Sequence, residues 1–249
     1  MKNLQQSLKQ VCALLMALSV LIANSVAQGN DFPTAAPEDV GVSSERLQRL
    51  SNTMQRYIDS NMLAGTVSLV SRNGKVIHVE SQGWKNKESN EPMTDDSIFV
   101  IMSMTKPIVS TALMMLYEEG NFLLTDPITD WIPELKGKQV VIEEDGIDYR
   151  MSAHRPITFR HVLSHTAGVD PSREVLTEEE LALLPRKATL EETLINRAPL
   201  PLSFHPGDDW QYGSSTDYVA LLVERISGQS LVDYLQEKIL DPLKMHDTS

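Results

Sequence analysis

Hydrophobic and polar positions follow two different periods in the first third of the chain. After Ser43, apolar side chains recur every three or four residues as far as Ile58, which predicts an amphipathic helix with a serine cap. Two β-rich runs, residues 66–70 and 76–79, then flank Asn73-Gly74. Because Asn-Gly suits the backbone of a tight hairpin turn, these runs are predicted to form an antiparallel hairpin.

From Ser103 onward the pattern is mainly helical. The predicted helices cover residues 103–120, 158–164, 190–197, 214–227 and 231–240. Residues 127–150, which are rich in Asp and contain two prolines, are interpreted as a surface excursion, with Glu143-Glu144-Asp145 as a solvated loop. A helix and a hairpin followed by a mostly helical region indicate an α/β fold of the α+β type. The lack of regular βαβ alternation disfavours a doubly wound parallel sheet.

Composition places the chain among folded globular proteins. Its 249 residues are 41% hydrophobic and 22% charged, which excludes a disordered tail, a collagen-like repeat and a disulfide-stapled mini-domain. The 34 Asp and Glu outnumber the 22 Lys and Arg, for a net charge of −12. Without a basic stripe to neutralise phosphates, no nucleic-acid partner is expected.

Residues 1–27 have the pattern of an export signal. Lys2 and Lys9 precede an apolar run of about 13 residues, and Ser25-Val26-Ala27 offers small residues for cleavage after Ala27. The alternative is a membrane anchor, but a spanning helix needs about 20 apolar residues. We therefore expect a periplasmic or secreted protein with no stable membrane anchor and a domain at residues 28–249. The single cysteine, Cys12, would leave with the signal, so no disulfide is expected.

The strongest candidate for chemistry is Ser103-Met104-Thr105-Lys106. A serine hydroxyl becomes a good nucleophile when a base removes its proton. On a helix, Ser and Lys three residues apart share one face, and a lysine in a partly desolvated pocket can act as that base. Pro107 agrees with a helix that begins near Ser103, because its missing N–H is not needed in a first turn. The alternative is chance, since Ser-x-x-Lys arises about once in a chain this long.

A second candidate is Tyr212-Gly213-Ser214. A lysine nearby lowers the pKa of a tyrosine, which could then carry the proton of the nucleophile to the leaving group. Ser214 could hydrogen-bond the lysine or the substrate. The alternative is a buried tyrosine followed by a capping serine at the start of a helix.

Two histidines have a spacing that could suggest a metal site. His161 and His165 lie four residues apart, as in some zinc sites on helices. No third ligand is evident in the sequence and Gly168 interrupts the pattern, so structural histidines are favoured. We expect neither a metal nor an organic cofactor.

Taken together, the motifs resemble the β-lactamase-related serine hydrolases, a family that contains class C β-lactamases, D-alanyl-D-alanine peptidases and carboxylesterases. The resemblance rests on residues 96–107, 124–128 and 157–169, on Pro206-Gly207 with Trp210, Tyr212, Ser214 and Tyr218, and on Gly228 and residues 241–245. It implies a β-lactamase/transpeptidase-like fold, in which an antiparallel sheet is flanked by a mostly helical region. It also implies Ser103 as the acylated nucleophile, Lys106 as its partner and Tyr212 as the proton shuttle, and Ser214 remains the candidate substrate-binding residue.

Two features depart from the family pattern. Members usually continue into a third motif (Lys-Thr-Gly, His-x-Gly or Trp-Gly-Gly) on a later strand that supplies half of the oxyanion hole, and nothing after Tyr212 matches it. We therefore expect an N-terminal fragment that lacks the C-terminal strands, with a natural truncation as the alternative. Penicillin-active members also often carry Asn where this chain has Ser214, which favours ester over β-lactam chemistry.

The sequence thus predicts an exported serine hydrolase that acts through an acyl-enzyme on small-molecule esters or amides, most similar to a carboxylesterase. The alternatives are a β-lactamase or D-alanyl-D-alanine carboxypeptidase and, in another class, a non-catalytic exported binding protein on the same fold. No oligomeric state follows from the sequence.

Overall fold

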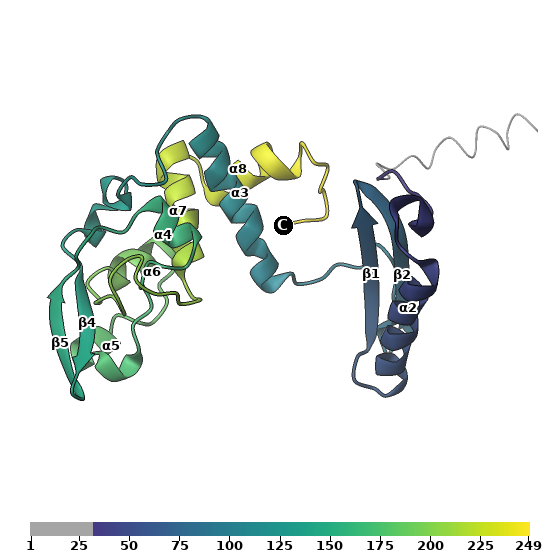
Figure 1. Ribbon diagram of the computed structural model, residues 1–249, viewed down its shortest axis with the longest axis horizontal. Helices are drawn as coiled ribbons and strands as arrows, with labels where there is room; N and C mark the ends of the chain where they lie inside the picture. The colour runs from purple at the N-terminus through teal and green to yellow at the C-terminus, as the bar shows by residue number, and fades with distance from the viewer. Residues whose placement is uncertain (1–31) are drawn as a thin grey trace, which may run out of the picture. The chain divides into compact units, whose positions relative to one another are not determined.

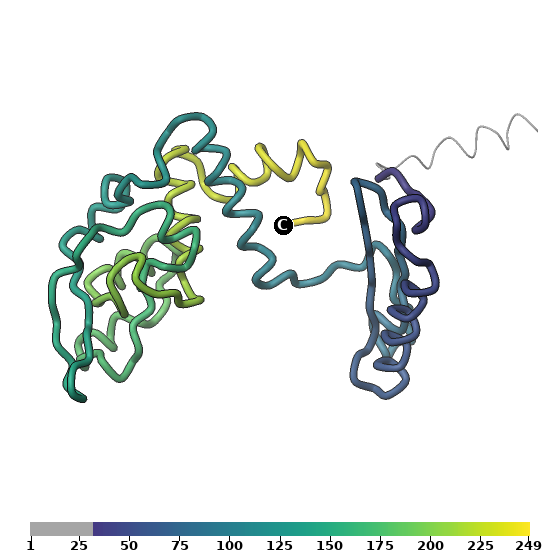
Figure 2. Tube along the Cα trace, in the orientation of Figure 1, coloured from purple at the N-terminus to yellow at the C-terminus, as the bar shows by residue number. Residues whose placement is uncertain are grey.

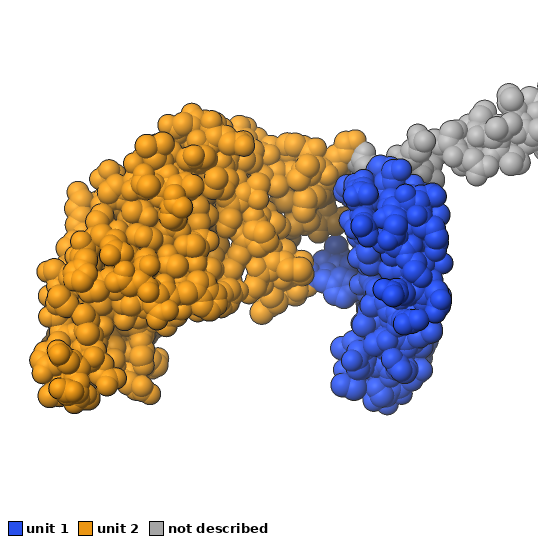
Figure 3. Space-filling model, viewed as in Figure 1, with its two compact units in different colours: residues 1–99 blue, residues 100–249 orange. Residues whose placement is uncertain are grey.

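The computed structural model of the protein describes residues 32–249 and separates into two compact units (Figure 1). One unit covers residues 1–99 and the other residues 100–249 (Figure 3). The predicted export signal at residues 1–27 lies outside the described residues. Across residues 32–249, no helix is both long and apolar enough to cross a membrane.

The first unit consists of a helix and a small antiparallel sheet. Its elements are the 3₁₀ turn η1 (Pro37–Val40), helix α2 (Ser44–Asp59) and strands β1 (Gly65–Arg72), β2 (Lys75–Asn86) and β3 (Glu91–Pro92), in the sheet order β1-β2-β3. The Ser43 side chain accepts a hydrogen bond from the Arg46 N–H, which confirms the predicted serine cap. Asn73 and Gly74 have φ angles of 54° and 70°, so the predicted hairpin turn is also confirmed.

Polar side chains hold α2 on the sheet. The buried Ser51 hydroxyl donates to the Glu80 carboxylate, and the Gln82 Nε2 donates to the Ser51 carbonyl at 3.2 Å. In the described part of this unit, only three apolar residues are buried, with less than a tenth of their surface exposed: Val40, Ile58 and Ile77. Hydrogen bonds therefore contribute much of the contact between α2 and β2.

The second unit is mostly helical. Its helices are α3 (Thr105–Glu118), α4 (Phe159–Leu163), α5 (Glu178–Leu181), α6 (Leu190–Arg197), α7 (Ser215–Ser227) and α8 (Leu231–Leu235). Its shorter turns are η2 (Met102–Met104), η3 (Ile128–Asp130), η4 (Pro133–Leu135), η5 (Arg173–Val175) and the π-helical η6 (Gln236–Leu240), and its strands are β4 (Gln139–Glu144) and β5 (Ile147–Ser152). The predicted helices are confirmed, except that the last one changes to a π-helical turn after Leu235 and that α5 was not predicted.

Helices α3 and α7 lie side by side and form the centre of this unit (Figures 1 and 2). Ala112 and Leu113 of α3 and Val219 and Leu222 of α7 are completely shielded from solvent. This packing holds the beginning of α3 and the loop before α7 in one region of the unit, and both segments carry predicted site residues.

The interpretation of residues 127–150 as a surface excursion is wrong. Ile128, Ile132 and Val140 are fully buried, and β4 and β5 form an antiparallel hairpin around Asp145-Gly146. Both turn residues have positive φ angles, 55° and 76°, as the tight hairpin requires. Glu143, Glu144 and Asp145 are exposed, as predicted, but they lie on this hairpin, whose first strand is anchored in the core by Val140. Antiparallel strands together with many helices confirm the predicted α/β class.

Candidate active site

Ser103 lies on the 3₁₀ turn η2, directly before α3. Pro107 is in the first turn of α3, where the helix needs no N–H from it. Met102, just before Ser103, has a φ angle of 49°, which is uncommon for a residue with a side chain. Such conformations persist where the surrounding structure enforces them, and they cluster at active sites.

The three predicted catalytic side chains meet at the Ser103 hydroxyl. The Tyr212 hydroxyl donates a hydrogen bond to Ser103 Oγ at 2.8 Å, and Lys106 Nζ donates to the same oxygen at 3.3 Å. Lys106 Nζ also lies 4.8 Å from the centre of the Tyr212 ring. Ser103 and Lys106 come from one turn of helix, whereas Tyr212 comes from the loop before α7. Their roles in a reaction stay a prediction.

The surroundings of Tyr212 make its phenol easier to ionise. The Lys106 ammonium and the hydrogen bond with Ser103 hold the pKa of the Tyr212 phenol below its usual value. A positive charge stabilises the phenolate, and once the phenol has ionised the Ser103 hydroxyl can donate to its oxygen, which acts in the same direction. A proton can therefore leave this phenol more readily than an isolated tyrosine.

His165 contacts the Tyr212 side chain, which the sequence analysis did not foresee. The two rings lie 4.9 Å apart between centres, and the Gln211 N–H donates to the His165 carbonyl at 2.9 Å. Burial, and then the nearby Lys106, lower the pKa of His165, which favours the neutral imidazole. The Trp210 ring lies 6.4 Å from that of His165 and 6.4 Å from that of Tyr212, so the three aromatic rings form one group.

His161 has a different partner. Its Nδ1 accepts a hydrogen bond from the Thr158 N–H at 3.1 Å and completes a capping box at the start of α4. His161 and His165 thus have separate structural environments. Within residues 32–249, no group of three or more His, Cys, Asp or Glu side chains is arranged to hold a metal ion.

Ser214 is bound to a carboxylate that the sequence analysis missed. Its N–H donates to Asp170 Oδ2 at 2.8 Å and its hydroxyl to Oδ1 at 2.6 Å. The predicted contact of Ser214 with a substrate stays a prediction. No short motif includes Asp170, and only the long-range contact reveals it.

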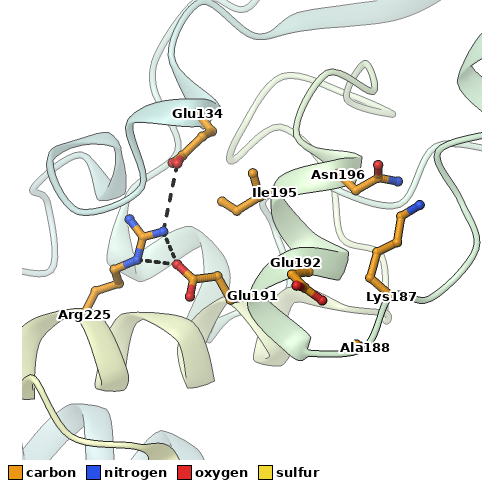
Figure 4. Close-up of a pocket in the computed structure, with 8 residues that line it drawn as sticks. All are labelled: Glu134, Lys187, Ala188, Glu191, Glu192, Ile195, Asn196 and Arg225. Atoms are coloured by element: carbon orange, nitrogen blue, oxygen red, sulfur yellow. Dashed lines mark hydrogen bonds and ion pairs between the residues drawn. The ribbon is translucent and has the colours of Figure 1, made fainter.

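A separate surface hollow lies between α6, α7 and η4 (Figure 4). Arg225 on its wall hydrogen-bonds the Glu191 carboxylate and the Trp131 carbonyl and lies 3.9 Å from Glu134. These contacts join three segments of the chain, which indicates a structural role for the arginine. The hollow shares no residue with the Ser103 group.

The amino-acid sequence matches a known protein family over most of its length. The sequence profile of the Beta-lactamase family matches residues 50–249. The chain belongs to this family. The serine hydrolase relationship inferred from the sequence is therefore confirmed at the level of the family.

Curated relatives in the Beta-lactamase family include two esterases. Esterase EstB of Burkholderia gladioli is 31% identical over 222 residues, which cover 86% of this chain and 53% of the esterase. Lovastatin esterase of Penicillium rubens is 29% identical over 209 residues, covering 80% of this chain and 52% of the relative. The chain spans about half the length of the curated relatives it matches.

A solved structure confirms the fold of this Beta-lactamase family member. EstCE1, described as a hydrolase with promiscuous acyltransferase activity, matches with a TM-score of 0.66 and 28% identity, over 80% of this chain and 51% of that protein. The β-lactamase/transpeptidase-like fold expected from the sequence is thus correct.

Proposed function

We propose that this protein is an exported hydrolase of small carboxylic esters that acts through an acyl-enzyme on Ser103. The observation that supports this most directly is the convergence of Tyr212 and Lys106 on one serine oxygen, at 2.8 Å and 3.3 Å. A serine with two proton-handling groups in contact is arranged for nucleophilic catalysis. The two esterases among its relatives favour esters as the substrate class.

In the proposed first step, Ser103 attacks the ester carbonyl. The ionised Tyr212 oxygen accepts the hydroxyl proton while Oγ forms a bond to the carbonyl carbon. The tetrahedral intermediate then expels the alcohol, which takes the proton back from Tyr212, and the acyl group stays on Ser103. The Lys106 ammonium stabilises the phenolate during this exchange, and the N-terminal end of α3 favours the negative charge on the intermediate.

In the proposed second step, water releases the acyl group. The water oxygen attacks the acyl carbon while Tyr212 accepts a proton from the water. The carboxylic acid departs when Tyr212 returns this proton to Ser103 Oγ. The same groups thus serve in both steps. No other proton carrier is required.

Acylation of Ser103 can be tested with p-nitrophenyl acetate and p-nitrophenyl butyrate. We expect Ser103→Ala to lower turnover by about 10³-fold or more, because the nucleophile is lost. Ser110→Ala is the matched control, since Ser110 lies about two turns further along α3. Mass spectrometry after brief exposure should find one acyl group on the peptide that contains Ser103. A Ser103→Ala protein with the turnover of the parent would contradict the proposal.

The same preparation separates the alternatives. Rapid hydrolysis of nitrocefin or stable acylation by penicillin, with slow ester turnover, would replace the esterase with a β-lactamase or D-alanyl-D-alanine carboxypeptidase. Saturable ligand binding without acylation, unchanged by Ser103→Ala, would identify a non-catalytic binding protein. Export is tested by cell fractionation and N-terminal sequencing, with Gln28 as the expected first residue.

A further inference from the structure

Asp170 holds the loop that carries Tyr212. Its side-chain oxygens accept one hydrogen bond each from the N–H and the hydroxyl of Ser214, at 2.8 Å and 2.6 Å. Its own carbonyl accepts a hydrogen bond from Ser203 Oγ at 2.9 Å, and Ser203 also contacts the Gln211 side chain at 3.0 Å. Contacts on both sides of Tyr212 therefore lead back to this one residue.

Gly213 shows how closely the carboxylate approaches the loop. A Cβ atom added to Gly213 would overlap Asp170 Oδ2 and would lie 2.7 Å from Cγ. Gly213 is not among the residues with a positive φ angle, so its backbone conformation would accept a side chain. The space that a side chain would need is occupied by Asp170.

Packing alone does not fix the Tyr212 side chain. Tyr212 as a residue is half exposed, at 52% of its surface. The residues on either side of it, however, are held by hydrogen bonds. The Gln211 N–H donates to the His165 carbonyl, and the Ser214 N–H donates to the Asp170 carboxylate. These bonds set the backbone of Tyr212, and the backbone sets the direction in which the phenol points toward Ser103.

We infer that Asp170 is a positioning residue for catalysis, which acts by fixing the loop so that the Tyr212 hydroxyl meets Ser103 Oγ. This inference rests on the proposed function, because it assigns to Asp170 the geometry of the proton shuttle. The hydrogen bonds found for the Asp170 side chain in the described residues go to Ser214 and not to Ser103 or Lys106. Its effect on the reaction is therefore carried through the loop.

Two substitutions separate geometry from charge. Asn at position 170 can accept the Ser214 N–H with its oxygen and donate to the Ser214 hydroxyl with its nitrogen, so Asp170→Asn should keep the loop in place. Asp170→Ala removes both bonds. We expect Asp170→Ala to lower kcat for p-nitrophenyl butyrate by about 10- to 100-fold with little change in KM, because small displacements of a reacting group cost that much. We expect Asp170→Asn to stay within about threefold of the parent.

A second measurement does not depend on turnover. The ionisation of Tyr212 is followed by ultraviolet difference titration of each protein against the same protein with Tyr212→Phe. Asp170→Ala should raise the pKa of Tyr212 toward that of an ordinary tyrosine, since the phenol leaves Lys106 and Ser103, whereas Asp170→Asn should leave it low. Asp208→Asn is the matched control, because Asp208 is a carboxylate near the same loop that pairs with Arg155.

Each outcome decides the inference. An unchanged Tyr212 pKa in Asp170→Ala overturns it, and so does an Asp170→Asn protein as impaired as Asp170→Ala, because the charge and not the position would then matter. A parent without ester turnover refutes the proposed function, whereas the titration still tests the positioning.

If Asp170→Ala does not fold, Gly213→Ala provides the test from the other side of the contact. The added methyl group must displace the loop or the carboxylate, so the Tyr212 pKa should rise and kcat should fall. A Gly213→Ala protein whose Tyr212 pKa and kcat both equal those of the parent would overturn the inference.

Discussion

At the scale of single residues, the Tyr212 hydroxyl is the group whose removal is most informative. Tyr212→Phe keeps the ring beside Lys106 and His165 but removes the oxygen bound to Ser103. We expect kcat for p-nitrophenyl butyrate to fall by about 10²- to 10⁴-fold, the usual range for the loss of a general acid–base. In the proposed mechanism the phenolate accepts the proton, so the rate of the parent should rise with pH through the pKa of Tyr212, which lies below that of an ordinary tyrosine.

The matched control is Tyr149→Phe on β5, where a tyrosine of similar exposure loses the same oxygen far from Ser103 in the chain. Its kcat and pH profile should equal those of the parent. A Tyr212→Phe protein that keeps its rate and its pH profile would exclude the phenol as the proton carrier.

The sequence and the structure contribute different residues to this site. Ser103, Lys106 and Tyr212 could be proposed from the sequence because each belongs to a short motif with chemical meaning. Asp170 could not, since it is 44 residues from Ser214 and its role follows from a contact made only in the fold. His165 was recognised as a structural histidine, but its place against Tyr212 depends on the path of a distant loop.

At the scale of elements, the same turn chemistry was recognised once and missed once. Asn73-Gly74 lies between runs of β-branched residues and was recognised. Asp145-Gly146 forms an equivalent turn, but the acidic run Glu143-Glu144-Asp145 suggested a solvated loop. Only one end of β4 is buried, so the strand lacks the alternation that reveals a half-buried sheet.

An ion pair joins β5 to α5 and gives a prediction about stability. Arg150 forms a bidentate salt bridge with Glu180. The hydrogen bond with the guanidinium lowers the pKa of Glu180 to about 2. Glu180→Gln keeps the capping contact with the Thr177 N–H but removes the charge. We expect a loss of about 1–3 kcal/mol in unfolding free energy at neutral pH, measured by urea denaturation.

The pH dependence of that loss identifies its origin. The folded-state pKa of Glu180 lies below its usual value of 4.5, so the stabilisation is complete above about pH 4.5 and disappears as the pH falls toward 2. The parent and Glu180→Gln should therefore converge in stability on acidification. A difference that is the same at pH 7 and pH 3 would show that the charge of Glu180 is not its cause.

At the scale of the whole molecule, apolar burial is distributed unevenly along the chain. Helix α2 has 16 residues, of which Ser51 and Ile58 are buried, whereas α7 has 13 residues, of which eight are buried. The large buried hydrophobic cluster of the described residues lies entirely between residues 109 and 240. Within that unit it includes α3 and α7, the elements next to Ser103 and Tyr212, so the candidate site rests on the most densely buried part of the chain.

Hydrogen exchange should report this difference. Because amides open locally with free energies that follow burial, we expect those of α7 to exchange about 10- to 100-fold more slowly than those of α2, measured by mass spectrometry on peptides from each helix. The two helices can be compared directly, since both are uninterrupted α-helices of more than ten residues. Equal protection would mean that the polar contacts of Ser51 and Gln82 secure α2 as firmly as apolar packing secures α7. Slow exchange confined to α3 and α7 would instead indicate that Ser103, Lys106 and Tyr212 lie next to the helices that unfold locally least often.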